Sequence, residues 1–202
     1  MALTLYGSPQ SRTMRVLWTL AELRLTFDHV PVAWDDPGLK SADFLALNPA
    51  GAIPTLVDGD FAIGESLAIN LYLARAYGAE TDLELRDLAT EANAWRWSLW
   101  AQGHLEPWVQ RDVRLADRLS GIGSVAAAMA SEALRLLERR LADTTWLSGT
   151  AFGVADLNVA AVLSPSRAAV LRLGPATSAW LGRCYSRPAA VDTRRRYSLT
   201  PD

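Results

Sequence analysis

The sequence predicts a small α/β domain followed by an all-helical domain. Three observations predict this division. Within residues 1–77, short β-rich runs alternate with helical patterns. From Leu83 onward, long stretches with helical spacing follow one another without a convincing strand. Hydrophobic residues make up 50% of the 202 residues and charged residues 21%, so both parts have enough apolar side chains to bury a core.

The first half of the α/β part is expected to contain a strand, a helix, a second strand and a short helix. Residues 2–6 are β-rich and end at Gly7-Ser8-Pro9. Apolar side chains recur at helical spacing between Ser11 and Leu25, and residues 27–32 alternate as in a strand. Ser41 then precedes a short apolar turn, as helix-capping residues do.

The second half is expected to be a hairpin followed by a helix. Asn48-Pro49 ends the short helix, and Ile53-Pro54 is a candidate cis peptide directly before a strand. Two apolar runs flank the Asp58-Gly59 turn and predict a hairpin. A helix runs from Glu65 to Tyr77. The resulting order, βαβ, α and then ββα, is that of a thioredoxin-like domain.

The C-terminal part is expected to be a helical bundle. Helical stretches cover about residues 84–118, 123–142, 154–164 and 176–187. Pro107 should kink or break the first of them, because proline lacks the N–H that a helix interior needs. We therefore expect a thioredoxin-like, ligand-binding domain at 1–77, a linker at 78–86 and an all-helical domain at 87–202.

Composition argues against several classes of function. The net charge is −2 and the one basic run is Arg194-Arg195-Arg196, so nucleic acid binding is not expected. No apolar run reaches the ~20 residues that span a bilayer, and no basic region precedes the first strand, so neither a membrane segment nor a signal peptide is expected. Cys184 is the single cysteine, which excludes an intramolecular disulfide. With only two histidines, no metal site is expected, and the expected location is cytoplasmic.

Ser11 is the first candidate for chemistry, because it stands between a strand and a helix. Its hydroxyl there is an N-cap candidate, which would be a purely structural role. The same place allows a functional role. A helix N-terminus favours a neighbouring anion, and the hydroxyl of Ser11 could donate a hydrogen bond to a thiolate.

The residues around Ser11 carry a resemblance to a known family. Leu5-Tyr6-Gly7-Ser8-Pro9-Gln10-Ser11-Arg12, with Arg15-Val16-Leu17, resembles the first strand, loop and helix of serine-type glutathione S-transferases, of the bacterial theta/phi-like kind. The resemblance implies that Ser11 activates the sulfur of glutathione. In tyrosine-type classes a tyrosine at the end of the first strand activates the sulfur. Tyr6 is therefore the second candidate for this role, and the structural alternative is that its ring packs in the core. Cysteine-type classes have a cysteine at the position of Ser11. This chain has none there, which disfavours disulfide exchange.

Four further positions match glutathione ligands of the family. The resemblance implies that Ile53, before Pro54, bonds the cysteinyl backbone, and that Glu65 and Ser66 bind the ammonium and carboxylate of the γ-glutamyl end. Lys40 matches the lysine that reaches the glycyl carboxylate. Each has a structural alternative. Pro54 could merely start an edge strand, Glu65 and Ser66 could cap a helix, and Lys40 could be an ordinary surface lysine. Leu39 and Ala52 replace a histidine and a glutamine of the family.

In the second domain, aromatic residues crowd one helical stretch. Trp97, Trp100, His104 and Trp108 are spaced for a common face, and core or interface packing is the alternative explanation. The resemblance implies that this helix lines the electrophile pocket, where Gln10, Arg12, Trp100 and His104 would meet the substrate, and that it contributes to a dimer contact. Gly153 replaces the Ser or Thr of the family's capping box, so only the Asp156 half should survive.

The sequence therefore predicts a homodimeric glutathione transferase with a detoxification role. Glutathione is the expected co-substrate, and the expected partner is a hydrophobic electrophile rather than nucleic acid or a membrane. Two alternatives stay open. One is a glutathione-dependent isomerase or peroxidase at the same site, and the other is a non-catalytic, transferase-like interaction module.

Overall fold

The structure is a computed structural model that describes residues 3–109, 122–169 and 171–197. The described residues form two compact units. One contains the residues up to Glu84 together with those from Arg187 onward, and the other contains Leu85–Ser186. The division into domains at 1–77 and 87–202, with a linker at 78–86, stays a prediction.

The first unit is built on a four-stranded sheet. Its strands are β1 (Leu3–Tyr6), β2 (Phe27–Val30), β3 (Thr55–Asp58) and β4 (Phe61–Gly64), in the order β2-β1-β3-β4. β1 runs parallel to β2 and antiparallel to β3, which pairs antiparallel with β4. Parallel strands need a crossover connection, and α1 (Thr13–Glu22) supplies it between β1 and β2. The predicted thioredoxin-like order of elements is confirmed.

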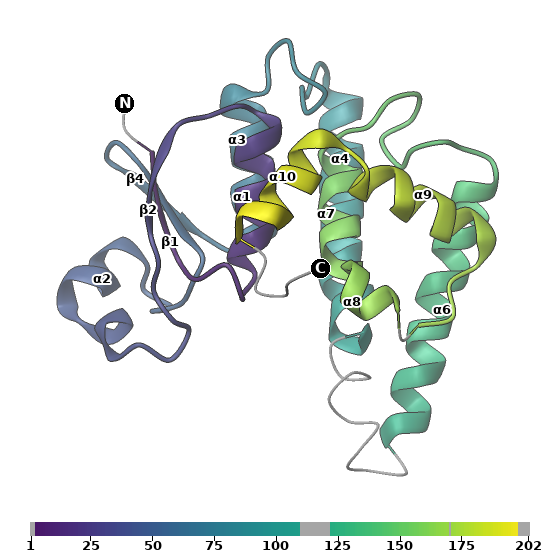
Figure 1. Cartoon of the computed structure of the whole chain (residues 1–202), viewed down its shortest axis with the longest axis horizontal. Coiled ribbons are helices and arrows are strands. Elements are labelled where there is room, and N and C mark those ends of the chain that lie inside the picture. Colours follow the sequence, from purple (N-terminus) through teal and green to yellow (C-terminus); the bar gives the residue numbers. More distant parts are fainter. Residues whose placement is uncertain (1–2, 110–121, 170, 198–202) are drawn as a thin grey trace. The chain divides into compact units, whose positions relative to one another are not determined.

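Helices cover both faces of this sheet. α1 and α3 (Ser66–Tyr77) lie on one side of it, and α2 (Ala42–Leu47) lies on the other (Figure 1). The largest fully buried side chains on the apolar stripes of α1 and α3 are Leu17, Leu20, Ile69 and Leu73. Before α2 comes the short 3-10 helix η1 (Pro37–Lys40). Ser41 caps α2 as predicted, because its hydroxyl accepts the N–H of Phe44 at 3.3 Å.

The hairpin is tied to α3 through Asp58. Gly59, with φ of 58°, allows the tight turn between β3 and β4. Asp58 is buried, and its Oδ2 accepts the hydroxyls of Tyr72, at 2.8 Å, and of Tyr77. Burial, assisted by the bond to Asp58, raises the pKa of Tyr72 to about 12. These bonds hold the helix that begins at Ser66 against the sheet.

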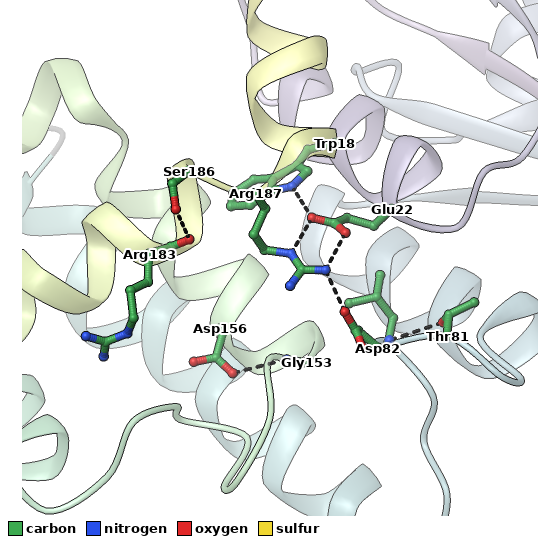
Figure 2. A network of polar contacts seen from close by, with 10 residues as sticks. Trp18, Glu22, Thr81, Asp82, Gly153, Asp156, Arg183, Ser186 and Arg187 are labelled. Carbon is green, nitrogen blue, oxygen red and sulfur yellow. Dashed lines mark hydrogen bonds and ion pairs between the residues drawn. The ribbon is translucent and has the colours of Figure 1, made fainter.

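The first unit is completed by the end of the described chain. α10 (Pro188–Tyr197), which the sequence pattern does not predict, packs against α1. Just before α10, the guanidinium of Arg187 bonds both oxygens of Glu22 at 2.8 and 2.9 Å and Asp82 at 2.7 Å (Figure 2). Trp18 Nε1 donates to the same Glu22 carboxylate at 2.9 Å. The side chain of Glu22 is only 6% exposed, so this buried carboxylate depends on its partners.

The second unit is helical, as predicted. Its elements are α4 (Leu88–Trp100), the π-helical turn η2 (Ala101–Leu105), α6 (Ile122–Ala142), α7 (Val154–Leu163), α8 (Pro165–Ala168) and α9 (Pro175–Tyr185). The irregularity expected at Pro107 takes the form of η2. Here the N–H of Glu106 reaches the C=O of Ala101, five residues back, and the helix continues to Val109. The predicted extension of this helix over 110–118 lies outside the described residues.

α7 is buried along its whole length. The carboxylate of Asp156, in its first turn, has four N–H partners. Asp156 accepts the main-chain N–H groups of Leu147, Ser148 and Gly153 at 2.7, 3.1 and 3.2 Å (Figure 2 shows the Gly153 bond). Trp180 Nε1 adds a fourth bond at 2.8 Å. The bond from Gly153 is the half of the capping box that the sequence predicts. Burial raises the pKa of Asp156, whereas the four donors favour its ionised form.

None of the described helices has the length and apolar character needed to cross a membrane.

Substituting Asp156 should destabilise the protein strongly. Asp156→Ala leaves four N–H donors without an acceptor in a buried site, and one unsatisfied buried donor already costs about 1–3 kcal/mol. We expect a loss of at least about 3 kcal/mol in the free energy of unfolding, measured by urea denaturation. Asp192→Ala is the matched control, because Asp192 is exposed and, among the described residues, pairs with Arg195 in the next helical turn. It should change the free energy by less than about 0.5 kcal/mol. Equal unfolding midpoints for the two variants would contradict the role of Asp156.

Candidate functional site

The strand register brings three loops to one end of the sheet. Tyr6 at the end of β1 pairs with Thr55 at the start of β3, and Thr55 pairs with Gly64 at the end of β4. The segment after Tyr6, the segment before Thr55 and the segment after Gly64 therefore start from neighbouring backbone positions. These segments carry Ser11, Ile53-Pro54 and Glu65-Ser66, so the sheet brings together three of the motifs that the sequence singles out.

Ser11 is half-buried in the turn that leads into α1. Its Oγ donates to the C=O of Ser8 at 2.7 Å and accepts the N–H of Thr13 at 3.1 Å. The Oγ1 atom of Thr13 lies 2.8 Å from it. α1 begins at Thr13, and Arg12 occupies the N-cap position without a side-chain cap. Ser11 nevertheless accepts the N–H of Thr13, the first residue of the helix, which is the kind of bond that the structural alternative expects. Its hydroxyl lies one residue before the N-cap position, beside the N-terminal turn of the helix.

Glu65 and Ser66 stand at the start of α3. Glu65 is exposed and holds the N-cap position with φ of 65° and no side-chain cap, so the capping alternative does not describe its carboxylate. A positive φ is uncommon for a residue with a side chain and is a local strain that the surrounding structure must sustain. Ser66 is buried, and Nη1 of Arg15, itself only 4% exposed, donates to its hydroxyl at 3.3 Å. A cation from α1 thus lies directly behind the start of α3.

The peptide bond between Ile53 and Pro54 is cis, as predicted. Ile53 is half-buried, and a Cβ on Gly7 would come within 3.2 Å of its side chain. The loop after β1 and the loop before β3 are therefore in contact. Among residues 3–109, no hydrogen bond engages the main chain of Ile53.

Lys40 is exposed and reaches the same loop. Its Nζ donates to the C=O groups of Ala50 and Gly51 at 3.1 and 2.9 Å. An ammonium group has three donors, so these two bonds leave it able to make another. Gly51 has φ of 55°, and a Cβ there would lie 2.7 Å from Nζ, so glycine gives the lysine its close approach.

Asn48 organises this loop, a role that the sequence reading missed. Its side chain is buried, donates to Ala52 C=O at 3.0 Å and Thr55 Oγ1 at 2.9 Å, and accepts the N–H of Ala50 at 3.1 Å. We interpreted Asn48-Pro49 only as the end of a helix. An Asn that can bond its own backbone two residues later is a signal for such a loop.

The remaining candidates in the first unit differ in their surroundings. The ring of Tyr6 packs edge-on against Phe44, with centroids 5.7 Å apart, which is a core contact. Gln10 and Arg12 are exposed in the turn around Ser11.

Trp100 and His104 belong to the second unit. Trp100 is half-buried and meets the buried Trp97 edge-on at 5.2 Å, and His104 is exposed. The predicted common face assumed an uninterrupted α-helix, whereas the π turn of η2 inserts one residue into the register between Trp100 and His104. The electrophile pocket formed with Gln10 and Arg12 stays a prediction.

Across the described parts of the chain, no group of three His, Cys, Asp or Glu side chains is arranged to hold a metal ion.

Comparisons with known proteins identify the family of this chain. The N-terminal domain of glutathione S-transferases matches residues 1–75, and the C-terminal domain matches residues 126–188. The chain is 35% identical over 217 residues to glutathione S-transferase 3 of Zea mays, covering 98% of this chain and 96% of that protein.

Solved structures show the same fold over the whole chain. A glutathione S-transferase III in its apo form superposes with a TM-score of 0.84 at 34% identity, covering 100% of both chains. A theta class glutathione S-transferase from the citrus canker pathogen Xanthomonas axonopodis pv. citri, solved with glutathione bound, has a TM-score of 0.84 at 26% identity, covering 98% of each chain. The predicted transferase activity and the thioredoxin-like domain followed by a helical domain are thereby confirmed: the chain belongs to the glutathione S-transferase family.

Proposed function

We propose that this transferase ionises glutathione at Ser11 and delivers the thiolate to a hydrophobic electrophile. The observation that supports this most directly is the row Tyr6–Thr55–Gly64 across the sheet. From that row start the three segments that carry Ser11, Ile53 and Glu65, all at one end of the sheet, which we call the proposed ligand edge. An extended tripeptide such as glutathione could be held at several points along that edge.

The interactions available at Ser11 are strong enough to lower the pKa of the glutathione thiol by part of the required amount. A free thiol has a pKa of ~8.5, and lowering it by two pH units requires about 2.7 kcal/mol. A hydrogen bond to a charged group contributes about 1.5–3 kcal/mol. Ser11 must first release the Ser8 carbonyl, a neutral bond of about 0.5–1.5 kcal/mol. With the middle of each range, the net gain is about 1–1.5 kcal/mol. The N-terminus of α1 adds about 0.3–1 kcal/mol, and together these lower the pKa by about one to two pH units.

From the sulfur at Ser11, the γ-glutamyl and glycyl ends of glutathione are proposed to extend in opposite directions along the proposed ligand edge. The γ-glutamyl ammonium pairs with the exposed carboxylate of Glu65, and the α-carboxylate binds the hydroxyl and N–H of Ser66 at the start of α3. The buried guanidinium of Arg15 behind Ser66 adds positive charge on that side. The cysteinyl backbone bonds Ile53, which precedes Pro54. The glycyl carboxylate accepts the third donor of Lys40.

The electrophile is proposed to meet the thiolate beside Gln10 and Arg12, with Trp100 and His104 supplying further pocket walls. Arg12 and Gln10 are exposed next to Ser11, which supports their half of this assignment. A panel of aryl halides, a hydroperoxide and an isomerisable α,β-unsaturated substrate separates transferase chemistry from the peroxidase and isomerase alternatives. The proposed location of the enzyme is cytoplasmic.

A two-fold homodimer is proposed from the surface of α4. Leu88, Trp95 and Leu99 are 82%, 46% and 65% exposed and recur at intervals of seven and four residues. They therefore form an apolar stripe on one face of α4, while Ala94 and Trp97 on the other side of the helix are buried. An exposed stripe of large apolar side chains is typical of a protein interface, and a second copy of the chain would cover it.

The role of Ser11 is tested by titrating the thiolate. With glutathione bound, the ultraviolet absorbance of the thiolate should appear at a pH about one to two units below that of free glutathione. Ser11→Ala should move this midpoint up by about one pH unit and reduce turnover at neutral pH about tenfold, with binding retained. Tyr6→Phe is the control and should leave the midpoint unchanged. The opposite pattern would make Tyr6 the residue that stabilises the sulfur.

The role of Glu65 is tested by glutathione affinity. Glu65→Ala removes the proposed partner of the ammonium, and the lost charged hydrogen bond of about 1.5–3 kcal/mol should weaken binding by about tenfold or more. Glu80→Ala is a matched control, because Glu80 is also an exposed glutamate with a positive φ, 61° against 65°. Isothermal calorimetry that gives both variants the same affinity would remove Glu65 from the site.

The dimer is tested by the mass of the protein in solution. We expect light scattering at micromolar concentration to give twice the mass of the chain, and Leu99→Glu to halve that value, because the charge would be buried unpaired in the interface. Val191→Glu makes the same change at an exposed apolar residue of α10 and should leave the mass unchanged. A monomeric mass for the unmodified protein would refute the proposed dimer.

A further inference from the structure

The hydroxyl of Ser11 is fully engaged within its own turn. A serine hydroxyl has one hydrogen to donate and two lone pairs. The Ser8 carbonyl, 2.7 Å away, can only accept, so it takes the hydrogen of Ser11. The N–H of Thr13, at 3.1 Å, takes one lone pair. The hydroxyl of Thr13, at 2.8 Å, must then be the donor in the bond between the two side chains.

Thr13 is placed for this bond. It is the first residue of α1 and is 0% exposed. Its Oγ1 occupies space that Gly7 leaves open, since a Cβ on Gly7 would lie only 2.2 Å from it. Gly7 has φ of 139°, in the region that favours glycine. Among residues 3–109, Ser11 is the one hydrogen-bond partner of the Thr13 side chain.

We propose that Thr13 is a positioning residue for Ser11, whose buried hydroxyl donates to Ser11 Oγ and so keeps the Ser11 hydrogen available for the glutathione sulfur. This inference rests on the proposed function of Ser11. When glutathione binds, the Ser11 hydrogen turns from the Ser8 carbonyl to the sulfur, and the thiol proton leaves to solvent. Both Thr13 donors stay on Ser11 Oγ throughout. Because hydrogen bonds in a chain polarise one another, a serine oxygen that accepts two bonds is a stronger donor to the thiolate.

The alternative is that Thr13 binds the sulfur itself. Its complete burial against Gly7 argues against this, whereas the half-buried Ser11 lies next to it with a surface that a ligand can reach. The two roles differ in one measurable way. A residue that acts through Ser11 has no effect on the sulfur once Ser11 lacks its hydroxyl, while a direct ligand keeps its effect.

Thr13→Val is the first test, since valine retains the shape of threonine and lacks the hydroxyl. We expect the thiolate midpoint of bound glutathione to rise by about half a pH unit, with kcat at neutral pH about threefold lower and the KM for glutathione unchanged. Thr19→Val is the matched control. Thr19 is also 0% exposed in α1, but its hydroxyl bonds the C=O of Arg15 at 3.1 Å, so its loss should leave the midpoint in place.

Two more variants make the test decisive. Thr13→Ser retains the hydroxyl without the methyl group and should keep the midpoint of the unmodified protein; a rise in this variant would show that packing sets the midpoint and would overturn the inference. Ser11→Ala combined with Thr13→Val should titrate like Ser11→Ala alone, and additive shifts would make Thr13 a direct ligand of the sulfur.

The outcomes also separate this inference from the proposed function. An unchanged midpoint in Thr13→Val, together with a raised midpoint in Ser11→Ala, overturns the role of Thr13 and keeps that of Ser11. Unchanged midpoints in both variants overturn the proposed activation by Ser11 as well.

Discussion

The antiparallel ladder of β1, β3 and β4 is the constraint on which the site depends. Tyr6, Thr55 and Gly64 lie side by side at one end of that ladder, and the chain leaves or enters the sheet at each of them. A shift of one residue in either pairing would turn every side chain of the strand to the other face, so the buried Leu5 and Leu56 hold the register. The hydrophobic core of the sheet thereby determines which loops meet.

Buried side chains near the proposed ligand edge hold those loops in shape. Asn48 bonds three positions, Ala50, Ala52 and Thr55, through a single buried side chain. Arg15 connects the first turn of α1 with the start of α3, so the two helix N-termini are fixed relative to each other by a buried cation. Since both termini favour anions, a ligand with negatively charged sulfur and carboxylate groups meets a favourable field at two points. The positive φ of Glu65 is sustained by this surrounding structure.

Sequence reasoning recovered the features that have local signals. The cis bond before Pro54, the turn at Gly59 and the cap at Ser41 each depend on a few adjacent residues, and all three are present. It did not find the roles of Thr13, Arg15 and Asn48. No local pattern shows that Arg15 meets Ser66, 51 positions away. The partners of Thr13 and Asn48 lie within seven residues, but these bonds depend on the shape of the turns. The extent of α1 was overestimated by two residues at its start, where the turn around Ser11 competes with the helix. The π form of the irregularity at Pro107 and the helix α10 were likewise not predicted from the sequence pattern.

The bond between Arg187 and Glu22 has a consequence for how the chain is made. The two residues are 165 positions apart, and the carboxylate of Glu22 is almost completely enclosed. During synthesis the ribosome releases β1 to α3 long before Arg187, so the emerging sheet must wait for its last helix while the whole Leu85–Ser186 unit is being translated. A polypeptide cut after Glu84 would leave the Glu22 carboxylate without the guanidinium of Arg187. The unit that carries Ser11, Ile53 and Glu65 is therefore begun before the Leu85–Ser186 unit and completed after it.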